Sequence, residues 1–526
     1  MSALARGRAL TVGLSIAALC AATAAAQDTR VAKSSASDCA ALAATAFTDV
    51  HITQAVAVAA AATSRAAIRV AHCKVSGVIG KETRFVLLLP DDWNQRFFMG
   101  GGGGFVGVID NHAQSSVNSG YATVGTDAGH QANTLTARWA LNQPDRIADY
   151  GYLAVHRTAE VAKQIIRAYY GSAPVKSYFF GCSNGGREAL MEAQRFPADF
   201  DGIVAVAPAA DFVGIAASFV RNLKAQYPTA DFTTPTITPA NLQLLQSSVL
   251  AACDARDGVR DGVLDDPRNC NFKLASIASC PGDAASPDCL TKSQRAAVEQ
   301  IYSPVTINGH VVYPGQPFGS EAAPGGWSDW ITGVTAGAMS ATGNHAPTVQ
   351  GAFGTEFFKY IVFGDSTWDY TKYDLSHWAA DTKRAAEILS ATNPDLSAFK
   401  ARGGKLILAH GWSDPALNPL KTIEYYEAVR SRDPSAASYL RLYMMPGVLH
   451  CVGGPGCDMV DWYAPITEWV EHGNAPGALV AAKAAAPASW TSASPYSRTR
   501  QLCPYPQHAV YGGQGSTDEA ARFTCK

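Results

Sequence analysis

The stretch FFGCSNGGREAL, residues 179–190, decides the fold of this chain. An apolar run leads into Gly181-Cys182-Ser183-Asn184-Gly185, and an amphipathic run follows. Glycines on both sides of a serine permit a sharp strand-to-helix turn that lifts the hydroxyl above a sheet. We therefore predict that Ser183 lies on a nucleophile elbow. The alternative is an ordinary glycine turn, which the motif alone does not exclude.

Apolar runs like the one before Ser183 recur along the chain and predict buried parallel strands. These runs are residues 85–89, 97–99, 121–125, 177–180, 202–207, 405–409 and 439–444. Between several of them, apolar residues recur at three-to-four spacing, which predicts helices at residues 152–170 and 187–196. Alternating strands and helices indicate an α/β sheet with its functional site at the carboxyl ends of the strands.

The alternation stops near Phe212 and resumes at Lys405. We predict a catalytic domain made of residues 27–212 and 400–526, interrupted by a lid domain of residues 213–399. A separate domain after a completed sheet is less favoured, because the strand pattern resumes afterwards. We expect the Ala-rich tract at residues 480–486 to be a surface helix or a linker.

Composition narrows the classes of protein. The chain has 526 residues, 47% of them hydrophobic, and a formal net charge of −2. No long basic run is present, which argues against a nucleic-acid partner. Residues 1–26 combine two arginines, an apolar run and Ala24-Ala25-Ala26, the pattern of a signal peptide. No other segment resembles a membrane span, so we expect a secreted or periplasmic protein that does not bind a membrane.

An exported protein can form disulfides. Of the 12 cysteines, Cys20 would leave with the signal peptide, and an odd number would remain. Short spacing favours four bonds: Cys39–Cys73, Cys253–Cys270, Cys280–Cys289 and Cys503–Cys525. Three further cysteines are left over, namely Cys182, Cys451 and Cys457.

A serine hydroxyl needs a general base, and after such an elbow an acid and then a histidine follow along the chain. Asp414 comes just after one predicted strand, and His450 lies in the loop after the next. We predict that His450 removes the proton of Ser183 and that Asp414 orients the imidazole. His410 is expected to be a packing residue, and His130 could line the site.

Residues 100–104 are five consecutive glycines after a predicted strand. Such a loop can direct backbone N–H groups at a developing oxyanion. We predict one donor from Gly103 or Gly104 and the other from Asn184, the residue after the serine. A phosphate-binding loop is disfavoured, because no Gly-Lys-Ser/Thr ending follows.

The cysteine beside the serine has a counterpart beside the histidine. Cys182 precedes the proposed nucleophile, and Cys451 follows the proposed base. If Ser183 and His450 are in hydrogen-bond contact, these neighbours must also lie close together. We predict a fifth disulfide, Cys182–Cys451, which would hold the base against the elbow. Two unrelated free thiols are the alternative, and Cys457 would be the leftover thiol.

Together, these motifs resemble the tannase and feruloyl esterase family, which also contains the hydrolase of mono(hydroxyethyl) terephthalate. The matching motifs are Cys-Ser-x-Gly-Gly-Arg-x-x-Leu at 182–190, Gly-x-x-Asp at 411–414, His450-Cys451, Trp93-Asn94, Gly129-His130 and Gly-Tyr-x-Ala-Val-His at 151–156. The resemblance covers nearly the whole mature chain. It implies a secreted α/β-hydrolase fold with a lid domain, a triad of Ser183, Asp414 and His450, and the Cys182–Cys451 bridge.

Residues 253–263, CDARDGVRDGV, place three aspartates at short spacing among turn glycines. By itself this pattern favours a solvated Asp-Gly turn over a cation site, and it departs from an EF-hand. The resemblance implies instead a structural calcium ion in the lid. The implied ligands are the side chains of Asp254, Asp257 and Asp261 and the carbonyls of Val259 and Val263. No organic cofactor is expected.

The predicted lid also bears on the substrate. Residues 301–358 contain no Lys or Arg, whereas a buried free carboxylate needs a cationic partner. In the terephthalate branch of the family, a lid arginine has this role. Aromatic residues of the lid favour an aromatic acyl group packed on ring faces, although at least half should form the lid's own core. The candidates for substrate contact are Trp327, Trp330, Phe353 and Phe357.

We expect a hydrolase of aromatic carboxylic esters, with hydroxycinnamate esters favoured over gallate esters. Two other classes remain open. An acyltransferase would deliver the acyl group to another alcohol, and a binding module would use the fold without catalysis.

Overall fold

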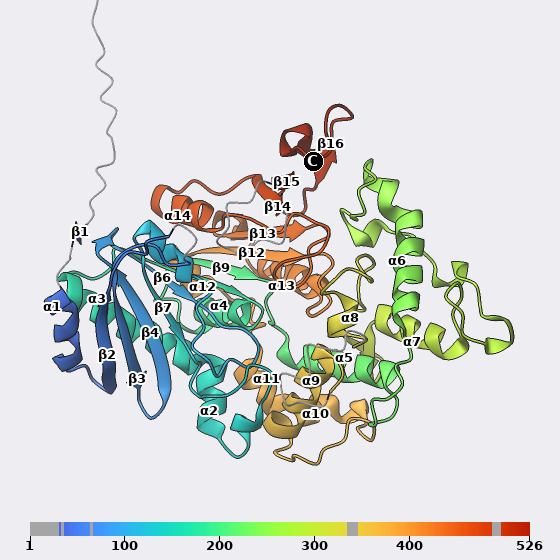
Figure 1. Cartoon of the computed structure of the whole chain (residues 1–526), viewed down its shortest axis with the longest axis horizontal. Helices are drawn as coiled ribbons and strands as arrows, with labels where there is room; N and C mark the ends of the chain where they lie inside the picture. The colour runs from blue at the N-terminus through green and yellow to red at the C-terminus, as the bar shows by residue number, and fades with distance from the viewer. Residues whose placement is uncertain (1–30, 33–35, 64–66, 334–345, 486–495) are drawn as a thin grey trace, which may run out of the picture.

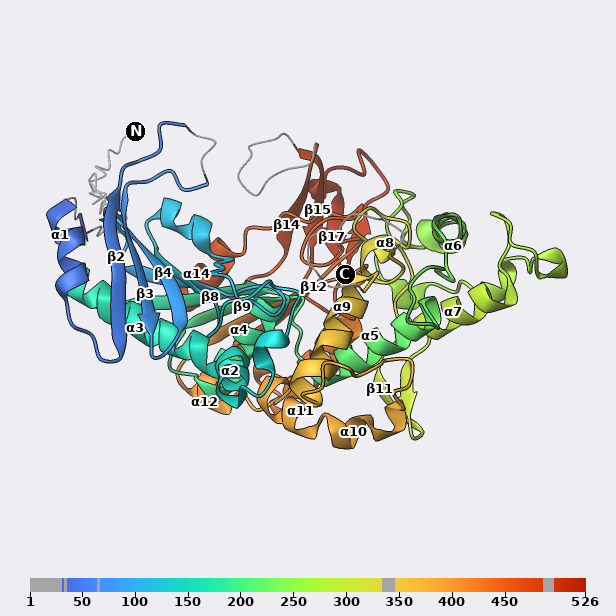
Figure 2. The same ribbon diagram turned by 60° about the horizontal axis from the view of Figure 1, so that its bottom comes forward.

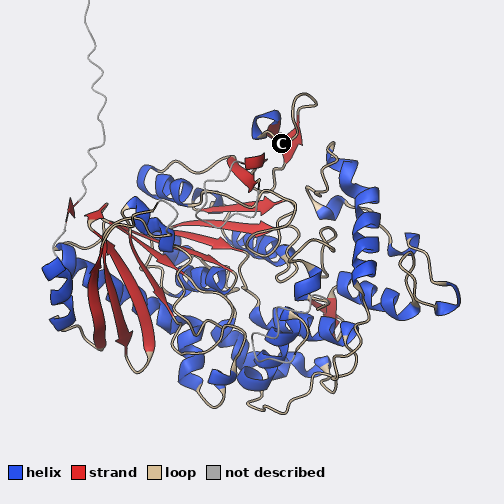
Figure 3. Cartoon of the chain, viewed as in Figure 1, coloured by secondary structure: helices blue, strands red, loops and turns tan. Residues whose placement is uncertain are grey.

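A nine-stranded sheet forms the centre of the molecule (Figures 1 and 3). The computed structural model describes residues 31–32, 36–63, 67–333, 346–485 and 496–526, so the predicted signal peptide lies outside the described residues. The strand order is β13-β12-β9-β8-β6-β7-β4-β3-β2. The strands are β2 (Val50–Val58), β3 (His72–Ile79), β4 (Thr83–Pro90), β6 (Arg96–Gly100), β7 (Ala122–Thr126), β8 (Lys176–Cys182), β9 (Gly202–Val206), β12 (Lys405–Gly411) and β13 (Leu440–Met445).

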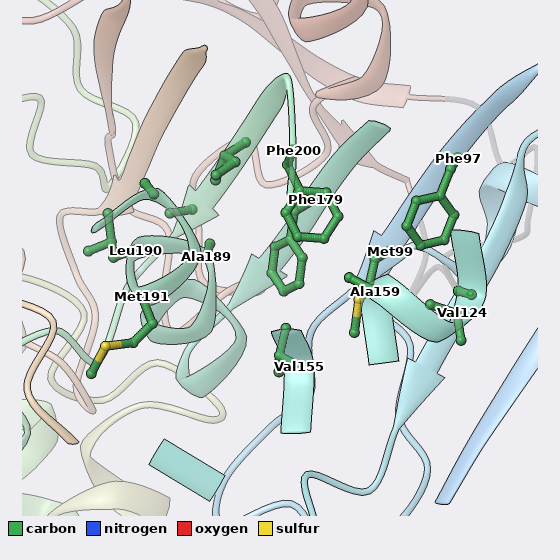
Figure 4. Close-up of a cluster of buried hydrophobic side chains, with 14 of the residues drawn as sticks. Phe97, Met99, Val124, Val155, Ala159, Phe179, Ala189, Leu190, Met191 and Phe200 are labelled. Carbon is green, nitrogen blue, oxygen red and sulfur yellow. The ribbon is translucent and has the colours of Figure 1, made fainter. Parts of the chain in front are cut away.

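Six of these strands, from β7 to β13 in the sheet order, run parallel and are covered on both faces. Successive side chains of a strand point to opposite faces, so each strand contributes to two cores. Phe97 and Phe179 face the core beneath α3 (Ala154–Tyr170), α4 (Asn184–Arg195), α12 (Ser397–Ala401) and α13 (Pro419–Arg432), as Figure 4 shows in part. Phe98 and Tyr178 face the other core, beneath α14 (Tyr463–His472).

Strand β4 departs from the prediction of a parallel strand at residues 85–89. It pairs antiparallel with both β3 and β7. The apolar run does predict burial correctly, because Phe85, Leu87 and Leu89 belong to the core beneath α3. Burial, however, leaves the direction of neighbouring strands open. The three-residue connection between β3 and β4 decides it, since so short a link joins only antiparallel strands.

Between β9 and β12 the chain leaves the sheet and later returns to it. The two strands are adjacent and parallel, with Val204 opposite Ile407. The elements from α5 to α11 lie on the side towards which β12 and β13 point, and α12 then returns to the core of the sheet (Figures 1 and 2). They are α5 (Phe212–Gln226), α6 (Pro239–Cys253), α7 (Lys292–Tyr302), β10 (Val305–Ile307), β11 (His310–Tyr313), α8 (Trp327–Trp330), α9 (Val349–Glu356), α10 (Trp378–Asp381) and α11 (Lys383–Leu389).

The C-terminal part adds two small hairpins. Strand β14 (Leu479–Ala484) pairs with β15 (Tyr496–Leu502), and β16 (Ala509–Tyr511) pairs with β17 (Phe523–Cys525). The expectation of a helix or linker at residues 480–486 is therefore wrong for the described part of that tract. Pairing with β15 overrides the helix preference of alanine there. The remaining elements are β1 (Val31–Ala32), α1 (Ala36–Ala41), β5 (Asp92–Trp93) and α2 (Pro144–Ala148).

Five disulfides join the ten cysteines that the sequence analysis paired. They are Cys39–Cys73, Cys182–Cys451, Cys253–Cys270, Cys280–Cys289 and Cys503–Cys525. Cys457 is a free, buried thiol, and burial raises its pKa to about 11. Within the described ranges, no helix is both long and apolar enough to cross a membrane.

Candidate active site

Ser183 occupies the turn between β8 and α4. Its φ of 64° and ψ of −124° form a conformation that residues with a side chain rarely adopt. Backbone segments approach so closely here that glycine is required. A Cβ at Gly181 would lie 2.2 Å from the carbonyl oxygen of Gly185, and one at Gly186 would lie 2.6 Å from that of Val206. The local geometry is therefore that of the predicted nucleophile elbow.

A histidine that contacts Ser183, and an aspartate that contacts the histidine, follow the ends of two adjacent strands. Nε2 of His450, in the loop after β13, lies 2.9 Å from Oγ of Ser183. Nδ1 of the same ring lies 2.8 Å from Oδ2 of Asp414, which follows β12. A carboxylate at Nδ1 holds the proton of the neutral ring on that nitrogen, which leaves Nε2 free to accept the serine proton. The structure thus brings together the three residues of the proposed triad.

Asp414 is fully buried and held by several donors. The N–H groups of Ala416 and Leu417 donate to its Oδ1 at 2.8 and 2.9 Å. Burial by itself would raise the pKa of Asp414, but the charge of His450 and hydrogen bonds from His410 and His450 hold it below its usual range. His410, expected as a packing residue, lies with Nε2 3.2 Å from Oδ2. Asp414 therefore stays anionic and can orient an imidazolium.

Two backbone N–H groups of the glycine loop form hydrogen bonds within the protein and are therefore not free to bind a substrate. The N–H of Gly102 donates to Oε2 of Glu188, and the N–H of Gly103 donates to Oδ2 of Asp110, both at 3.0 Å. The prediction that Gly103 could be an oxyanion donor is therefore corrected, because its amide is already engaged. Gly104 lines the cavity beside Ser183 and remains the loop's candidate.

Asn184, the second candidate donor, is the first residue of α4, where a backbone N–H has no partner within the helix. Its side chain has four hydrogen-bond partners, one of which is the carbonyl oxygen of Gly102, which accepts from Nδ2 at 3.2 Å. Nδ2 donates to Oε1 of Glu188 at 2.9 Å, and Oδ1 accepts from Nε of Arg187 at 2.8 Å. The hydroxyl of Tyr150 lies 2.9 Å from Oδ1 and 3.0 Å from the carbonyl oxygen of Gly104. Tyr150 thereby links the two candidate donors.

Five residues of this network were missed by the sequence analysis, namely Asp110, His112, Tyr150, Arg187 and Glu188. Tyr150, Glu188 and Arg187 are buried, and burial raises the pKa of Glu188 to about 7. His112 accepts the N–H of Cys182 on Nδ1 at 3.2 Å, and its Nε2 lies 3.4 Å from Oδ2 of Asp110. Charged residues within the elbow motif and polar residues after the glycine run were the available signal for all of them except Tyr150, which no such motif marked.

The Cys182–Cys451 disulfide connects the residue before the serine to the residue after the histidine. The bond closes a separation of 269 residues along the chain. Cys451 has a φ of 63°, so the histidine loop is itself in an unusual backbone conformation. A covalent link at this point opposes relaxation of that loop away from the elbow.

A cavity of about 480 Å³, counting its open mouth, lies against Ser183 and His450. Its aromatic lining residues are Phe105, Phe212, Phe219, Trp330, Phe353 and Phe357. Trp330 meets the ring of His450 edge-on, with centroids 5.0 Å apart. Three of the four predicted substrate-contact residues therefore lie at the cavity. His130 does not line it, and instead stacks on Trp139.

Trp327 does not belong to the cavity lining, which corrects its expected contact with substrate. It is 2% exposed and packs with Leu242, Leu245 and Ile331 in a core of the inserted region. Residue type alone could not distinguish Trp327, a core residue, from Trp330, a cavity residue three positions later. Trp330 packs against the same core, but it is only partly buried and reaches the cavity.

The aspartates with an expected calcium role share one loop. Asp254 and Asp257 lie in a single 3-10 turn, and Oδ1 of Asp254 accepts the N–H of Gly262 at 3.0 Å. Oδ2 of Asp261 accepts from Nη2 of Arg500 at 2.6 Å. Within the described residues, the His, Cys, Asp and Glu ligand atoms that converge within 4.8 Å belong to a different cluster, that of His156, Glu192 and Asp199. The three loop carboxylates do not converge in that way.

Partly buried carboxylates nevertheless lie close together in and beside this loop. Burial raises the pKa of Asp257, and the charges of Asp261 and Asp254 raise it further. Burial and neighbouring carboxylates raise the pKa of Asp265 to about 7. Oxygen donors with excess negative charge are the chemistry that calcium binds. The residues fit the ion chemically, and their side chains would turn towards one another to hold it.

The parallel sheet, the strained serine after β8 and the residues at the ends of β12 and β13 define a protein of the α/β-hydrolase class. The family model "Tannase and feruloyl esterase" matches residues 67–526, and the chain belongs to this family. The resemblance found in the sequence motifs is thereby confirmed, and the protein is a carboxylic ester hydrolase.

Individual relatives align over most of their length. An uncharacterised esterase of Xanthomonas campestris pv. campestris is 38% identical over 86% of this chain and 84% of its own. A mono(2-hydroxyethyl) terephthalate hydrolase of Piscinibacter sakaiensis is 34% identical over 89% and 87%. The crystal structure of feruloyl esterase B from Aspergillus oryzae superimposes with a TM-score of 0.81 at 25% identity, covering 93% of this chain and all of that one.

Replacing both bridge cysteines, Cys182→Ser with Cys451→Ser, should lower stability by about 3 kcal/mol and reduce kcat more than it raises KM. The reason is that the histidine loop would no longer be tied to the elbow. Thermal unfolding and steady-state kinetics check this. The matched control is Cys280→Ser with Cys289→Ser, which removes a disulfide in the inserted region and should spare kcat. Wild-type kcat in the Cys182/Cys451 variant would contradict the role of the bridge.

Tyr150→Phe removes one hydroxyl and should lower kcat about tenfold with little change in KM, because the link between Gly104 and Asn184 is lost. The neighbouring substitution Tyr152→Phe is the control, since the Tyr152 ring stacks on Phe196 without touching either candidate donor. Equal kcat values in the two variants would show that Tyr150 does not position the donors.

Proposed function

We propose that this esterase hydrolyses esters of aromatic carboxylic acids, of the hydroxycinnamate or gallate type, through an acyl-enzyme on Ser183. The observation that carries the proposal is the 2.9 Å contact between Nε2 of His450 and Oγ of Ser183, two residues that line an aromatic cavity. The names of the family relatives, which include feruloyl esterases and a terephthalate monoester hydrolase, support an aromatic acyl group.

In this mechanism, Ser183 attacks the ester carbonyl while Nε2 of His450 takes the hydroxyl proton. The negative charge that develops on the carbonyl oxygen is stabilised by the backbone N–H groups of Gly104 and Asn184. The imidazolium, held by Asp414, then donates its proton to the leaving alcohol. Water enters, His450 takes a proton from it, and the same steps in reverse order release the acid.

The inserted region is proposed to act as a lid, because α5, α8 and α9 contribute most of the aromatic cavity wall. Hydroxycinnamate esters are favoured over gallate esters, and a terephthalate monoester is disfavoured. Residues 301–358 hold no Lys or Arg to pair with a free carboxylate. The five disulfides support export to an oxidising compartment, secreted or periplasmic, with residues 1–26 as the signal peptide.

We also propose a structural calcium ion in the loop of residues 254–263. Burial and, secondarily, neighbouring carboxylates raise the pKa values of Asp257 and Asp265, and a cation bound beside them would favour their ionised forms. Asp254, Asp257 and Asp261, with the carbonyls of Val259 and Val263, would hold it. The ion would stabilise the loop beside the Cys253–Cys270 disulfide and take no part in the reaction.

Ser183→Ala should lower kcat for methyl ferulate, methyl gallate and 4-nitrophenyl acetate by at least about 1,000-fold, because the nucleophile is lost. Ser177→Ala, on the same strand but remote from the cavity, is the control and should keep wild-type rates. Substantial turnover by the Ser183 variant, with any of the three esters, would refute the mechanism.

Removal of calcium with EGTA should lower the melting temperature by several degrees, and added calcium should restore it, because a ligand that binds only the folded state stabilises it. Asp257→Asn should abolish this response, whereas Asp365→Asn, in an exposed loop, should retain it. Elemental analysis that finds no metal, together with melting curves unaffected by EGTA, would remove the calcium site.

A further inference from the structure

We propose that the inserted region positions the acid of the triad, and that Gln316 and Gln350 are the positioning residues. Each donates a hydrogen bond to a backbone carbonyl of the loop that carries Asp414. Each therefore acts on His450 through the orientation of that aspartate. This inference rests on the triad of the function proposed above and adds residues of the inserted region to it.

The acid loop, residues 413–418, connects β12 to α13 and is folded around its own carboxylate. Oδ1 of Asp414 accepts the N–H groups of Ala416 and Leu417, at 2.8 and 2.9 Å. Oδ2 faces Nδ1 of His450 at 2.8 Å. The path of the loop backbone thus sets the direction of the carboxylate, so whatever fixes this backbone also fixes the contact with the histidine.

Two successive carbonyl groups of the acid loop accept hydrogen bonds from glutamine side chains of the inserted region. Nε2 of Gln316 donates to the carbonyl oxygen of Asp414 at 2.5 Å, and Nε2 of Gln350 donates to that of Pro415 at 2.7 Å. A carbonyl oxygen only accepts hydrogen bonds, so each contact requires the donor end of the amide. A glutamine meets this requirement, whereas an apolar side chain of similar length, such as methionine, does not.

Further contacts from the inserted region hold both ends of the acid loop. At its start, Oγ of Ser320 donates to Oγ of Ser413 at 3.1 Å. At its end, the N–H of Asn418 donates to the hydroxyl of Tyr313 at 3.0 Å, and Nδ2 of Asn418 donates to the carbonyl oxygen of Gly315 at 2.7 Å. The inserted region therefore holds the loop at its start, at the acid and at its end.

Gln350 is itself fixed on its far side. It is 2% exposed in helix α9, and its Oε1 accepts from Nδ2 of Asn222 in helix α5 at 3.0 Å. Both helices line the cavity, α5 with a face that carries Ile215 and Phe219, and α9 with Phe353. The helices that shape the cavity and the loop that carries the acid are thus joined by one buried run of hydrogen bonds.

Apolar packing joins the same parts of the molecule. Ala416 and Leu417 line the cavity and pack with Val305, Ile307 and Tyr313 of the hairpin formed by β10 and β11. Because the N–H groups of Ala416 and Leu417 also hold the acid, a motion of the inserted region that broke this packing would misdirect the carboxylate as well.

The test replaces each glutamine by methionine in the full mature chain, which removes the donor and keeps a side chain of similar length. Gln350→Met and Gln316→Met should each lower kcat for 4-nitrophenyl acetate about tenfold and change KM less than about twofold. The reason is that a misdirected acid impairs proton transfer and leaves the cavity intact. Wild-type kcat in both variants would overturn the proposal.

Two other glutamines of the inserted region provide matched controls. Gln226 is buried and donates to two backbone carbonyls of that region, at 2.9 and 3.0 Å, and Gln300 is partly buried and donates to one, at 3.0 Å. Gln226→Met and Gln300→Met should lower the melting temperature about as much as the substitutions of Gln350 and Gln316, but keep wild-type kcat. If kcat falls in all four variants in proportion to the melting temperature, the role is structural only and the proposal is overturned.

A double-mutant cycle separates this inference from the function on which it rests. Asp414→Asn should by itself lower kcat at least about 100-fold, and wild-type activity in this variant would show that the proposed triad is wrong. In the Asp414→Asn background, Gln350→Met should change kcat less than about twofold, because a residue that acts through the acid then has nothing to position. If the two losses instead multiply, the triad stands and the positioning role is overturned.

Discussion

The strained, positive-φ backbone of Ser183 is the constraint on which the rest of the site depends. A residue with a side chain in this conformation costs on the order of 1–3 kcal/mol, and it persists only where its surroundings hold it. Here the surroundings are strand β8 in the middle of the sheet and the first turn of α4, brought together by the glycines at 181, 185 and 186. Because the turn is rigid, everything that acts on Ser183 must be positioned relative to it.

Three groups of contacts meet this requirement. The Cys182–Cys451 bond ties the histidine loop to the elbow, and the amides after Asp414 tie the acid to the cavity wall. A buried set of polar side chains, with Glu188 and Tyr150 at its centre, ties the glycine loop to the start of α4. Such groups are costly to bury unless they are satisfied, so their mutual hydrogen bonds make the arrangement stiff as well as stable.

The sequence predicted the features that depend on neighbouring residues along the chain. The elbow motif, the order of serine, acid and histidine, and the short cysteine spacings each carry their own local signal, and the structure brings those residues together. Expectations failed where a distant partner decides the outcome. An apolar run did not reveal that β4 is antiparallel, and an Ala-rich tract did not reveal pairing of β14 with β15.

Within the site, too, the sequence could not predict features that depend on distant partners. By itself, the sequence determined which loops carry the chemistry, because turn glycines, strand ends and the paired Cys182 and Cys451 are visible as patterns. Only the tertiary structure decided that Asp110 takes the amide of Gly103, that Trp327 is core while Trp330 lines the cavity, and that one face of α5 forms its wall. The physical reason is that hydrogen bonds and side-chain packing depend on distance in space. The partners in this site lie from 7 to more than 200 positions apart along the chain.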